Sequence, residues 1–206
     1  MSAFIPLPVD EHIHVAWPTP NHALFEASEK FFARTRANPN FGKPGFTRDC
    51  GKRFHRGCDI APVNFTTTGK TTRVILTDCA TGKDFESDEP TFVPHDDVSC
   101  VYDGNVSEIV TDESASDFGV HIIVEHIWPR SREKFFTIYA HLCEVCVSLH
   151  SSLFTLHPLG RMGQTGRTAD ARNWMAIAPH LHFEVRNAVG EAYDPVEFLT
   201  RFLASS

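Results

Sequence analysis

His180-Leu181-His182-Phe183-Glu184-Val185-Arg186 is the segment around which the rest of the chain is organised. Polar and apolar side chains alternate along it, which is typical of a strand with one face toward a core. His180 and His182 are therefore expected on the same face. Two imidazoles side by side can share a metal ion, or one can bind it while the other transfers a proton.

Two upstream segments carry donors of the same kind. His55-Arg56-Gly57-Cys58-Asp59 places an imidazole and a carboxylate four positions apart, a spacing that a bent strand or loop can close onto one ion. Tyr139-Ala140-His141-Leu142 follows an apolar run, and strand alternation predicts that Tyr139 and His141 share a face. The sequence thus holds three groups of candidate ligands, far apart along the chain.

These donors match the needs of catalytic zinc, which takes three nitrogen or oxygen ligands and keeps a fourth position for water. His55, Asp59 and His182 are the predicted ligands of one zinc ion per chain. His141 and His180 then remain as unligated imidazoles near the water. They are suited to act as general base and to stabilise a developing oxyanion.

The motifs also resemble, in their order along the chain, those of the lysostaphin-type or LytM-like zinc metallopeptidases, which cleave peptide bridges or stems of bacterial peptidoglycan. The ordered elements are His55 to Asp59, Ile60-Ala61-Pro62, Tyr139 to Leu142, Gly163-Gln164-Thr165-Gly166, and His180 to Arg186 followed by Asp194-Pro195. The resemblance implies the same three zinc ligands and makes His141 and His180 the catalytic histidines. It does not say which of the two is the base.

The expected fold is mainly β, an antiparallel catalytic domain of the lysostaphin/LytM type, related to the duplicated hybrid motif. Residues 1–45 are predicted to form an N-terminal helical appendage, with a helix from His22 to Arg36. Residues 46–206 are predicted to form the metallopeptidase domain. A β-hairpin is expected as an insertion at about residues 63–90, where the family runs almost directly into its next strand.

A second expansion separates the Gly-Gln-Thr-Gly turn from His180. It runs from Arg167 to Pro179 and brings Trp174 toward the expected rim of the site. Tyr139, Trp174 and the inserted hairpin are therefore predicted to contact substrate.

Charge and composition exclude several classes of partner. The net charge is −7 with histidines neutral, so the basic footprint of a nucleic-acid-binding protein is missing. No long apolar segment predicts a membrane span.

The N-terminus does not read as a secretory signal, so the chain as written is expected in the cytoplasm, and action in the periplasm or outside the cell would need another export route. The sequence does not indicate an oligomeric state.

The six cysteines show no framework that predicts a disulfide scaffold, and reduced thiols are expected in a chain of this size without a signal sequence.

The sequence as a whole predicts a zinc metalloendopeptidase acting on a peptide, with peptidoglycan cross-bridges or stem peptides as the implied substrate. Two alternatives stay open. One is a binding or regulatory module that keeps the fold without the chemistry. The other is a zinc amidase or peptidase that acts on a peptide outside the cell wall. Metal content and the effect of removing ligands distinguish the first alternative from the enzymes.

Overall fold

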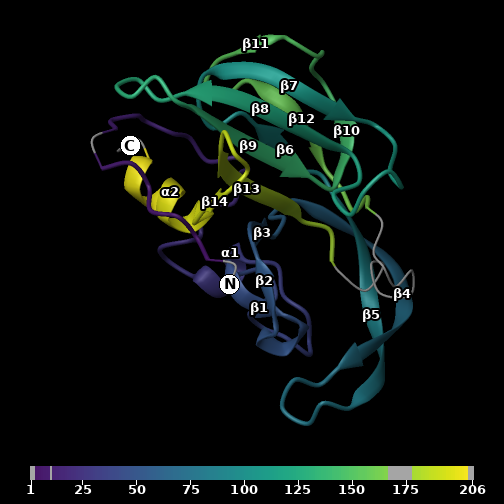
Figure 1. Ribbon diagram of the computed structural model, residues 1–206. Helices are drawn as coiled ribbons and strands as arrows, with labels where there is room; N and C mark the ends of the chain where they lie inside the picture. The colour runs from purple at the N-terminus through teal and green to yellow at the C-terminus, as the bar shows by residue number, and fades with distance from the viewer. Residues whose placement is uncertain (1–2, 10, 167–177, 204–206) are drawn as a thin grey trace.

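The predicted antiparallel β architecture is confirmed by the computed structural model, which describes residues 3–9, 11–166 and 178–203. Its main sheet has the strand order β11-β7-β8-β9-β13-β14, and a further short strand, β3, pairs with the start of β13 (Figure 1). These strands are β3 (Cys58–Ile60), β7 (Gly104–Val110), β8 (His121–Ile127), β9 (Lys134–Ala140), β11 (Ser152–Leu153), β13 (Leu181–Asn187) and β14 (Ala192–Tyr193).

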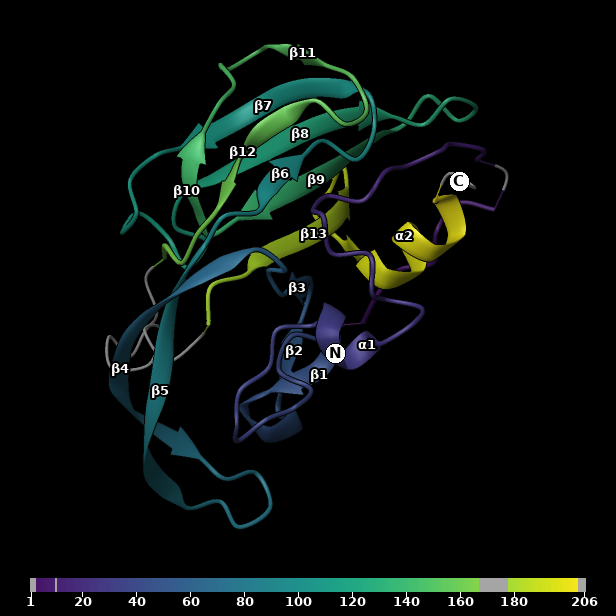
Figure 2. The same cartoon turned by 180° about the vertical axis from the view of Figure 1, so that it is seen from behind.

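A smaller sheet lies beside the main one, as Figure 2 shows from behind. Its strands are β10 (Leu142–Val145), β12 (Pro158–Met162) and β6 (Asp97–Ser99), in that order. A separate hairpin joins β1 (Gly45–Arg48) to β2 (Arg53–His55) through the 3-10 turn η1 (Asp49–Gly51). This hairpin carries His55 at its end, so its position decides where that imidazole lies.

The inserted hairpin is confirmed and is longer than expected. It consists of β4 (Phe65–Thr77) and β5 (Asp84–Pro94) and extends away from both sheets (Figure 1). A disulfide between Cys50 and Cys79 joins its tip to η1, with the two Cα atoms 5.0 Å apart. The expectation that all thiols are reduced is therefore corrected for this pair, because the insertion folds back far enough to bring Cys79 to Cys50. The other four cysteines are free.

The core forms against one face of the central strands. On β13, Leu181, Phe183 and Val185 are fully buried, as the alternation predicted. Phe183 pairs in register with Tyr139 of β9, and both side chains belong to the core. The opposite face of β13 presents His182, Glu184 and Arg186, so one strand supplies core residues on one side and polar groups on the other.

The N-terminal segment contains a much shorter helix than predicted. Helix α1 spans only Ser28–Phe31. Phe32 then takes an extended conformation and pairs with Ile60, which ends the helix. Phe31, Phe32 and Val15 are buried in the same core as the sheet. The division of the chain at residue 45 stays a prediction.

The described part of the chain ends in helix α2 (Pro195–Phe202) and Leu203. The Asp194 carboxylate accepts hydrogen bonds from the Val196 and Glu197 backbone N–H groups, which caps the helix start. Phe198 and Phe202 are buried against the core. No helix in the described parts of the chain is long and apolar enough to cross a membrane.

Candidate metal centre

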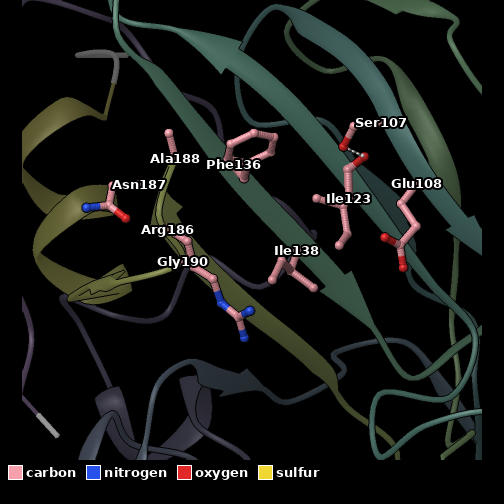
Figure 3. Close-up of a pocket in the computed structure, with 9 residues that line it drawn as sticks. All are labelled: Ser107, Glu108, Ile123, Phe136, Ile138, Arg186, Asn187, Ala188 and Gly190. Carbon is pink, nitrogen blue, oxygen red and sulfur yellow. Dashed lines mark hydrogen bonds between the residues drawn. The ribbon is translucent and has the colours of Figure 1, made fainter.

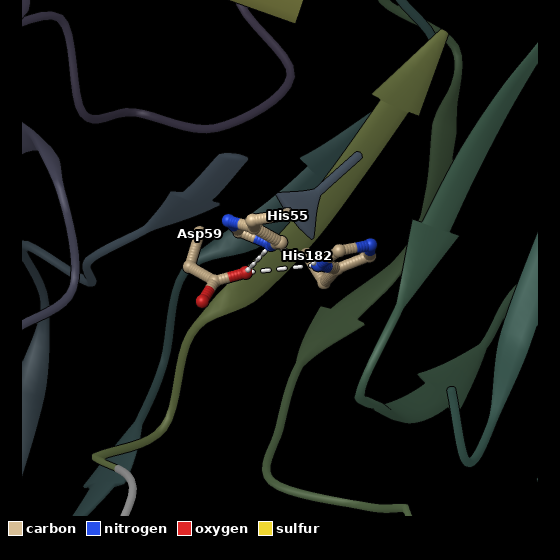
Figure 4. A group of neighbouring side chains, drawn as sticks. All are labelled: His55, Asp59 and His182. Atoms are coloured by element: carbon tan, nitrogen blue, oxygen red, sulfur yellow. Dashed lines mark hydrogen bonds and ion pairs between the residues drawn. The ribbon is translucent and has the colours of Figure 1, made fainter. Parts of the chain in front are cut away.

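Three strands bring the predicted ligands together. His55 ends β2, while Asp59 on β3 lies directly opposite His182 on β13 in an antiparallel register. Figure 4 shows the three side chains pointing toward one another. Gly57 makes the tight turn between β2 and β3 possible, because a Cβ there would lie 2.6 Å from Cε1 of His182. The chain passes so close to the imidazole that only glycine fits.

The donor atoms of this cluster have the spacing of a zinc site. His55 Nε2 lies 3.2 Å from His182 Nδ1 and 3.2 Å from Asp59 Oδ1, and His182 Nδ1 lies 2.9 Å from the same oxygen. Adjacent ligands of a tetrahedral zinc ion with bonds of about 2.0–2.1 Å are about 3.3 Å apart. All three residues are buried, and they are the one group of potential metal ligands among the described residues. The three atoms therefore fit a single ion.

The tautomer of His55 agrees with this role. Its Nδ1 lies 2.9 Å from the Lys43 carbonyl oxygen, which can only accept, so Nδ1 carries the proton. Nε2 is then left with a lone pair that faces Asp59 and His182. A backbone carbonyl that fixes the far nitrogen of an imidazole is the usual support for a histidine that binds metal.

His141 and His180 lie next to the cluster. Their ring centroids are 4.8 Å apart, and His180 Nε2 is 3.6 Å from Asp59 Oδ2. His141 Nδ1 donates to the Thr165 carbonyl at 2.7 Å, and His180 Nδ1 donates to the Ala178 carbonyl at 2.8 Å. Each imidazole thus has its proton on Nδ1 and its Nε2 lone pair available. The structure brings all five predicted histidine and aspartate residues together.

Burial keeps most of these imidazoles neutral. It lowers the pKa of His141 well below 6.5, and the neighbouring His180 and His182 lower it further. Burial also lowers the pKa values of His55 and His180, although Asp59 opposes the shift in both. Neutral imidazoles are the form that can accept a proton.

His182 behaves differently from the other histidines of the site. Burial acts to lower its pKa, but hydrogen bonds to Asp59 and Glu184 outweigh burial and raise the value to about 9. Its Nε2 lies 2.8 Å from Glu184 Oε1, so this carboxylate orients the ring with Nδ1 toward Asp59. Carboxylates in this position orient metal-binding histidines and increase their basicity.

Glu184, Arg186 and Arg48 are residues of the site that sequence reasoning missed. Glu184 and Arg186 form an ion pair on the His182 face of β13, and their i, i+2 spacing was the signal that could have found them. Arg48 forms an ion pair with Asp59 and donates from Nη2 to His55 Nε2 at 2.9 Å. Burial acts to raise the Asp59 pKa, but Arg48, then His55 and His180, outweigh it and hold it well below 3.8.

Of the two residues predicted to contact substrate, Tyr139 and Trp174, the structure describes only Tyr139. Tyr139 has no exposed surface, and its hydroxyl accepts a hydrogen bond from the Val101 backbone N–H at 3.0 Å. The prediction that it contacts substrate is therefore corrected. Strand β9 ends at Ala140 and His141 has a φ of 65°, so the alternation that linked Tyr139 to His141 does not continue to that residue. Trp174 lies outside the described residues.

A cavity of about 310 Å³ lies at Arg186, which is on the same face of β13 as His182. Figure 3 shows the residues that line it. It holds none of the five predicted site residues, but Arg186 in its wall is paired with Glu184, the partner of His182. Side chains from β7, β8 and β9 complete it. The lining residues are Ser107, Glu108, Ile123, Phe136, Ile138, Arg186, Asn187, Ala188 and Gly190.

A second cavity, of about 180 Å³, includes Ala178 and Pro179, the two residues before His180. Ala178 and Pro179 form one wall, and Ala178 is the residue whose carbonyl holds His180 Nδ1. Residues 89–92 of β5 form another wall. The inserted hairpin thus lines a cavity next to the segment that leads into His180, and its contact with substrate stays a prediction.

Similar folds occur among solved structures. The catalytic domain of the prophage-encoded M23 protein EnpA from Enterococcus faecalis is 14% identical over 81% of this chain and 89% of that chain, with a TM-score of 0.45. The catalytic domain of the antimicrobial peptidase lysostaphin from Staphylococcus simulans is 19% identical over 77% and 89%, also with a TM-score of 0.45. A chain of the SpoIIQ-SpoIIIAH pore-forming complex is 21% identical over 90% of each chain, with a TM-score of 0.50.

Sequence comparison gives the family. No curated protein sequence matches the chain. The family profile described as Peptidase family M23 matches residues 80–195, which is more than half of the 206 residues. His141, His180 and His182 fall within the match, whereas His55 and Asp59 precede it. The chain belongs to peptidase family M23.

Proposed function

We propose that this protein is a zinc-dependent endopeptidase whose ion is held by His55, Asp59 and His182. The observation that carries the proposal is the approach of one donor atom from each residue to within 2.9–3.2 Å of the other two. Family membership supports peptidase chemistry. Zinc bound here would lower the pKa of a water molecule to about 7 and polarise the scissile carbonyl.

Proton transfer and stabilisation of the oxyanion are assigned to the two neighbouring histidines. His141 and His180 each have Nδ1 fixed by a backbone carbonyl, so Nε2 is the atom that can exchange a proton at the site. One of these histidines removes the proton of the attacking water. The other, when its Nε2 carries a proton, donates a hydrogen bond that stabilises the negative charge on the carbonyl oxygen. Their lowered pKa values provide the neutral form that general-base catalysis needs.

Peptidoglycan is the proposed source of the substrate, on the strength of the motif resemblance described above. The cavity beside Arg186 supports binding of an extended peptide, because it lies on the His182 face and combines the apolar Ile123 and Phe136 with charged groups. It offers the accessible surface that Tyr139 lacks. We therefore propose that this cavity contacts the peptide on one side of the cleaved bond.

Zinc content and peptide cleavage test this function together. The chain, purified without added metal and then reconstituted, is expected to hold one zinc and to cleave a peptidoglycan-derived peptide. His141→Ala and His180→Ala are each expected to keep the zinc and lose most of the cleavage. A folded chain that takes up no zinc would exclude the proposal.

A binding or regulatory module is the second candidate, and Arg48 is the observation that favours it. Its guanidinium contacts Asp59 and His55, two of the three proposed ligands, and so supplies positive charge where the ion would. A chain of this kind would fold and bind its partner without zinc. The reconstitution experiment separates the two candidates.

A further inference from the structure

We infer that Arg48 competes with the metal for the site: its guanidinium occupies the metal-binding lone pair of His55 and balances Asp59 in the metal-free protein, and the ion must displace it from His55. This inference rests on the proposed zinc site.

The first argument concerns one lone pair. His55 donates from Nδ1 to the Lys43 carbonyl, so Nε2 has only its lone pair to offer. Arg48 donates an N–H of Nη2 to that atom at 2.9 Å. The same Nε2 faces Asp59 Oδ1 and His182 Nδ1 across the proposed ion position. A lone pair that accepts a hydrogen bond cannot at the same time bind an ion, so Arg48 and zinc exclude each other at His55.

The second argument concerns charge. Each buried carboxylate of the site already has an arginine partner: Asp59 pairs with Arg48, and Glu184 pairs with Arg186. The Asp59 side chain has no exposed surface and that of Arg48 is 9% exposed, so water screens this pair weakly. A divalent ion entering here meets ligands whose negative charge is already neutralised. Removing the Arg48 charge would take away one of the cationic groups beside Asp59 and leave more of its negative charge to attract the ion.

The third argument concerns how firmly Arg48 is held. Its guanidinium carbon lies 3.6 Å from the centroid of the Phe41 ring, on which it stacks. Phe41 therefore keeps the cation in place against the ligands. The metal-free protein gains a paired Asp59 from this arrangement, because an isolated buried carboxylate would be strongly destabilising. Arg48 thus stabilises the fold before metal arrives and weakens the binding of metal.

Zinc affinity of the metal-free chain tests the inference, measured by titration with zinc chloride against a chromophoric chelator. Arg48→Gln keeps N–H donors but removes the charge, and is expected to bind zinc at least about tenfold more tightly, because a like charge a few ångströms from the ion is lost from weakly screened surroundings. Arg53→Gln is the matched control, since Arg53 is exposed and pairs with Asp49 at the surface. It is expected to match the parent.

The melting temperature gives a second measurement. Metal-free Arg48→Gln is expected to melt below the parent, and zinc is expected to restore more of its stability than it adds to the parent. If Arg48→Gln does not fold, Phe41→Leu keeps the charge but removes the ring that holds it, and is expected to tighten zinc binding by a smaller factor.

The outcomes separate the two proposals. A parent that binds one zinc, with Arg48→Gln equal or weaker in affinity, overturns the competition and makes Arg48 a residue that only positions Asp59. An unchanged or weaker affinity in Phe41→Leu does the same. A folded parent that binds no zinc overturns the proposed function, and the inference with it.

Discussion

Two buried histidine environments share the central sheet, and they differ in how their nitrogens are used. His126 on β8 donates from Nδ1 to the Asp103 carbonyl at 2.8 Å, and its Nε2 lies 2.7 Å from the Thr137 hydroxyl. Both nitrogens are hydrogen-bonded to groups of the protein interior. At the metal centre, in contrast, one nitrogen of His55, His141 and His180 is fixed by a carbonyl and the other faces the site. Burial alone does not make a histidine functional; a nitrogen lone pair that faces the other ligands does.

The largest expected effect comes from removing one imidazole from each environment. His182→Ala deletes one of three ligands and is expected to weaken zinc binding on the order of 1,000-fold, given the free energies of structural zinc sites. His126→Ala is expected to keep one zinc per chain, although it should be less stable. Metal analysis of both folded variants tests the distinction. Equal zinc loss in the two would show that the comparison is wrong.

The pH dependence of stability tests the structural histidine of the comparison, His126. Burial lowers the pKa of His126 from 6.5 to about 4. The unfolded chain therefore binds a proton at this position between pH 6.5 and 4 that the folded chain does not, so the contribution to stability is present above pH 6.5 and is lost as the pH falls toward 4. The full loss amounts to about 3 kcal/mol.

Urea unfolding at several pH values measures this contribution. His126→Asn cannot titrate, so its free energy of unfolding is expected to fall less than that of the parent between pH 6.5 and 4. His55, His141 and His180 also have lowered pKa values, and the parent-minus-variant difference removes their share. Parallel curves for the two proteins would contradict the assignment of His126 as a neutral structural group.

The smallest expected effect concerns the carboxylate behind His182. Glu184→Gln retains the shape but weakens the hydrogen bond to Nε2, and should reduce zinc affinity by roughly 10-fold to 100-fold. Glu108→Gln is the matched control, because Glu108 lies 3.3 Å from His121 on the same sheet but is largely exposed. It should leave the affinity unchanged. A Glu184→Gln variant with parental affinity would remove Glu184 from the site.

The sequence predicted much of this arrangement for identifiable reasons. Alternation along residues 180–186 placed His180 and His182 on one face and Phe183 in the core, because a regular strand has a period of two. The same rule failed for Tyr139, where the strand ends before His141. Arg48 could not have been found in this way. It is a single arginine in β1, and only the folding of the β1–β2 hairpin onto β3 brings it to Asp59.

The N-terminal helix and the disulfide were missed because both depend on distant contacts. The apolar residues from Leu24 to Ala33 have helical spacing, but Phe32 pairs with Ile60 as an extended residue instead. Cys50 and Cys79 are separated by 29 positions, and nothing local indicates that the inserted hairpin returns its tip to η1. Tertiary packing decided both.

The Cys50–Cys79 bond makes residues 50–79 a covalent ring that includes His55 and Asp59 but not His182. A protease that cuts β4 between Lys70 and Thr71, where the strand is exposed, would yield two polypeptides. The first would contain His55 and Asp59, the second His182, and the disulfide would still join them. The nicked protein would therefore migrate as one molecule until a reductant was added, with all three proposed ligands held in a single covalent unit.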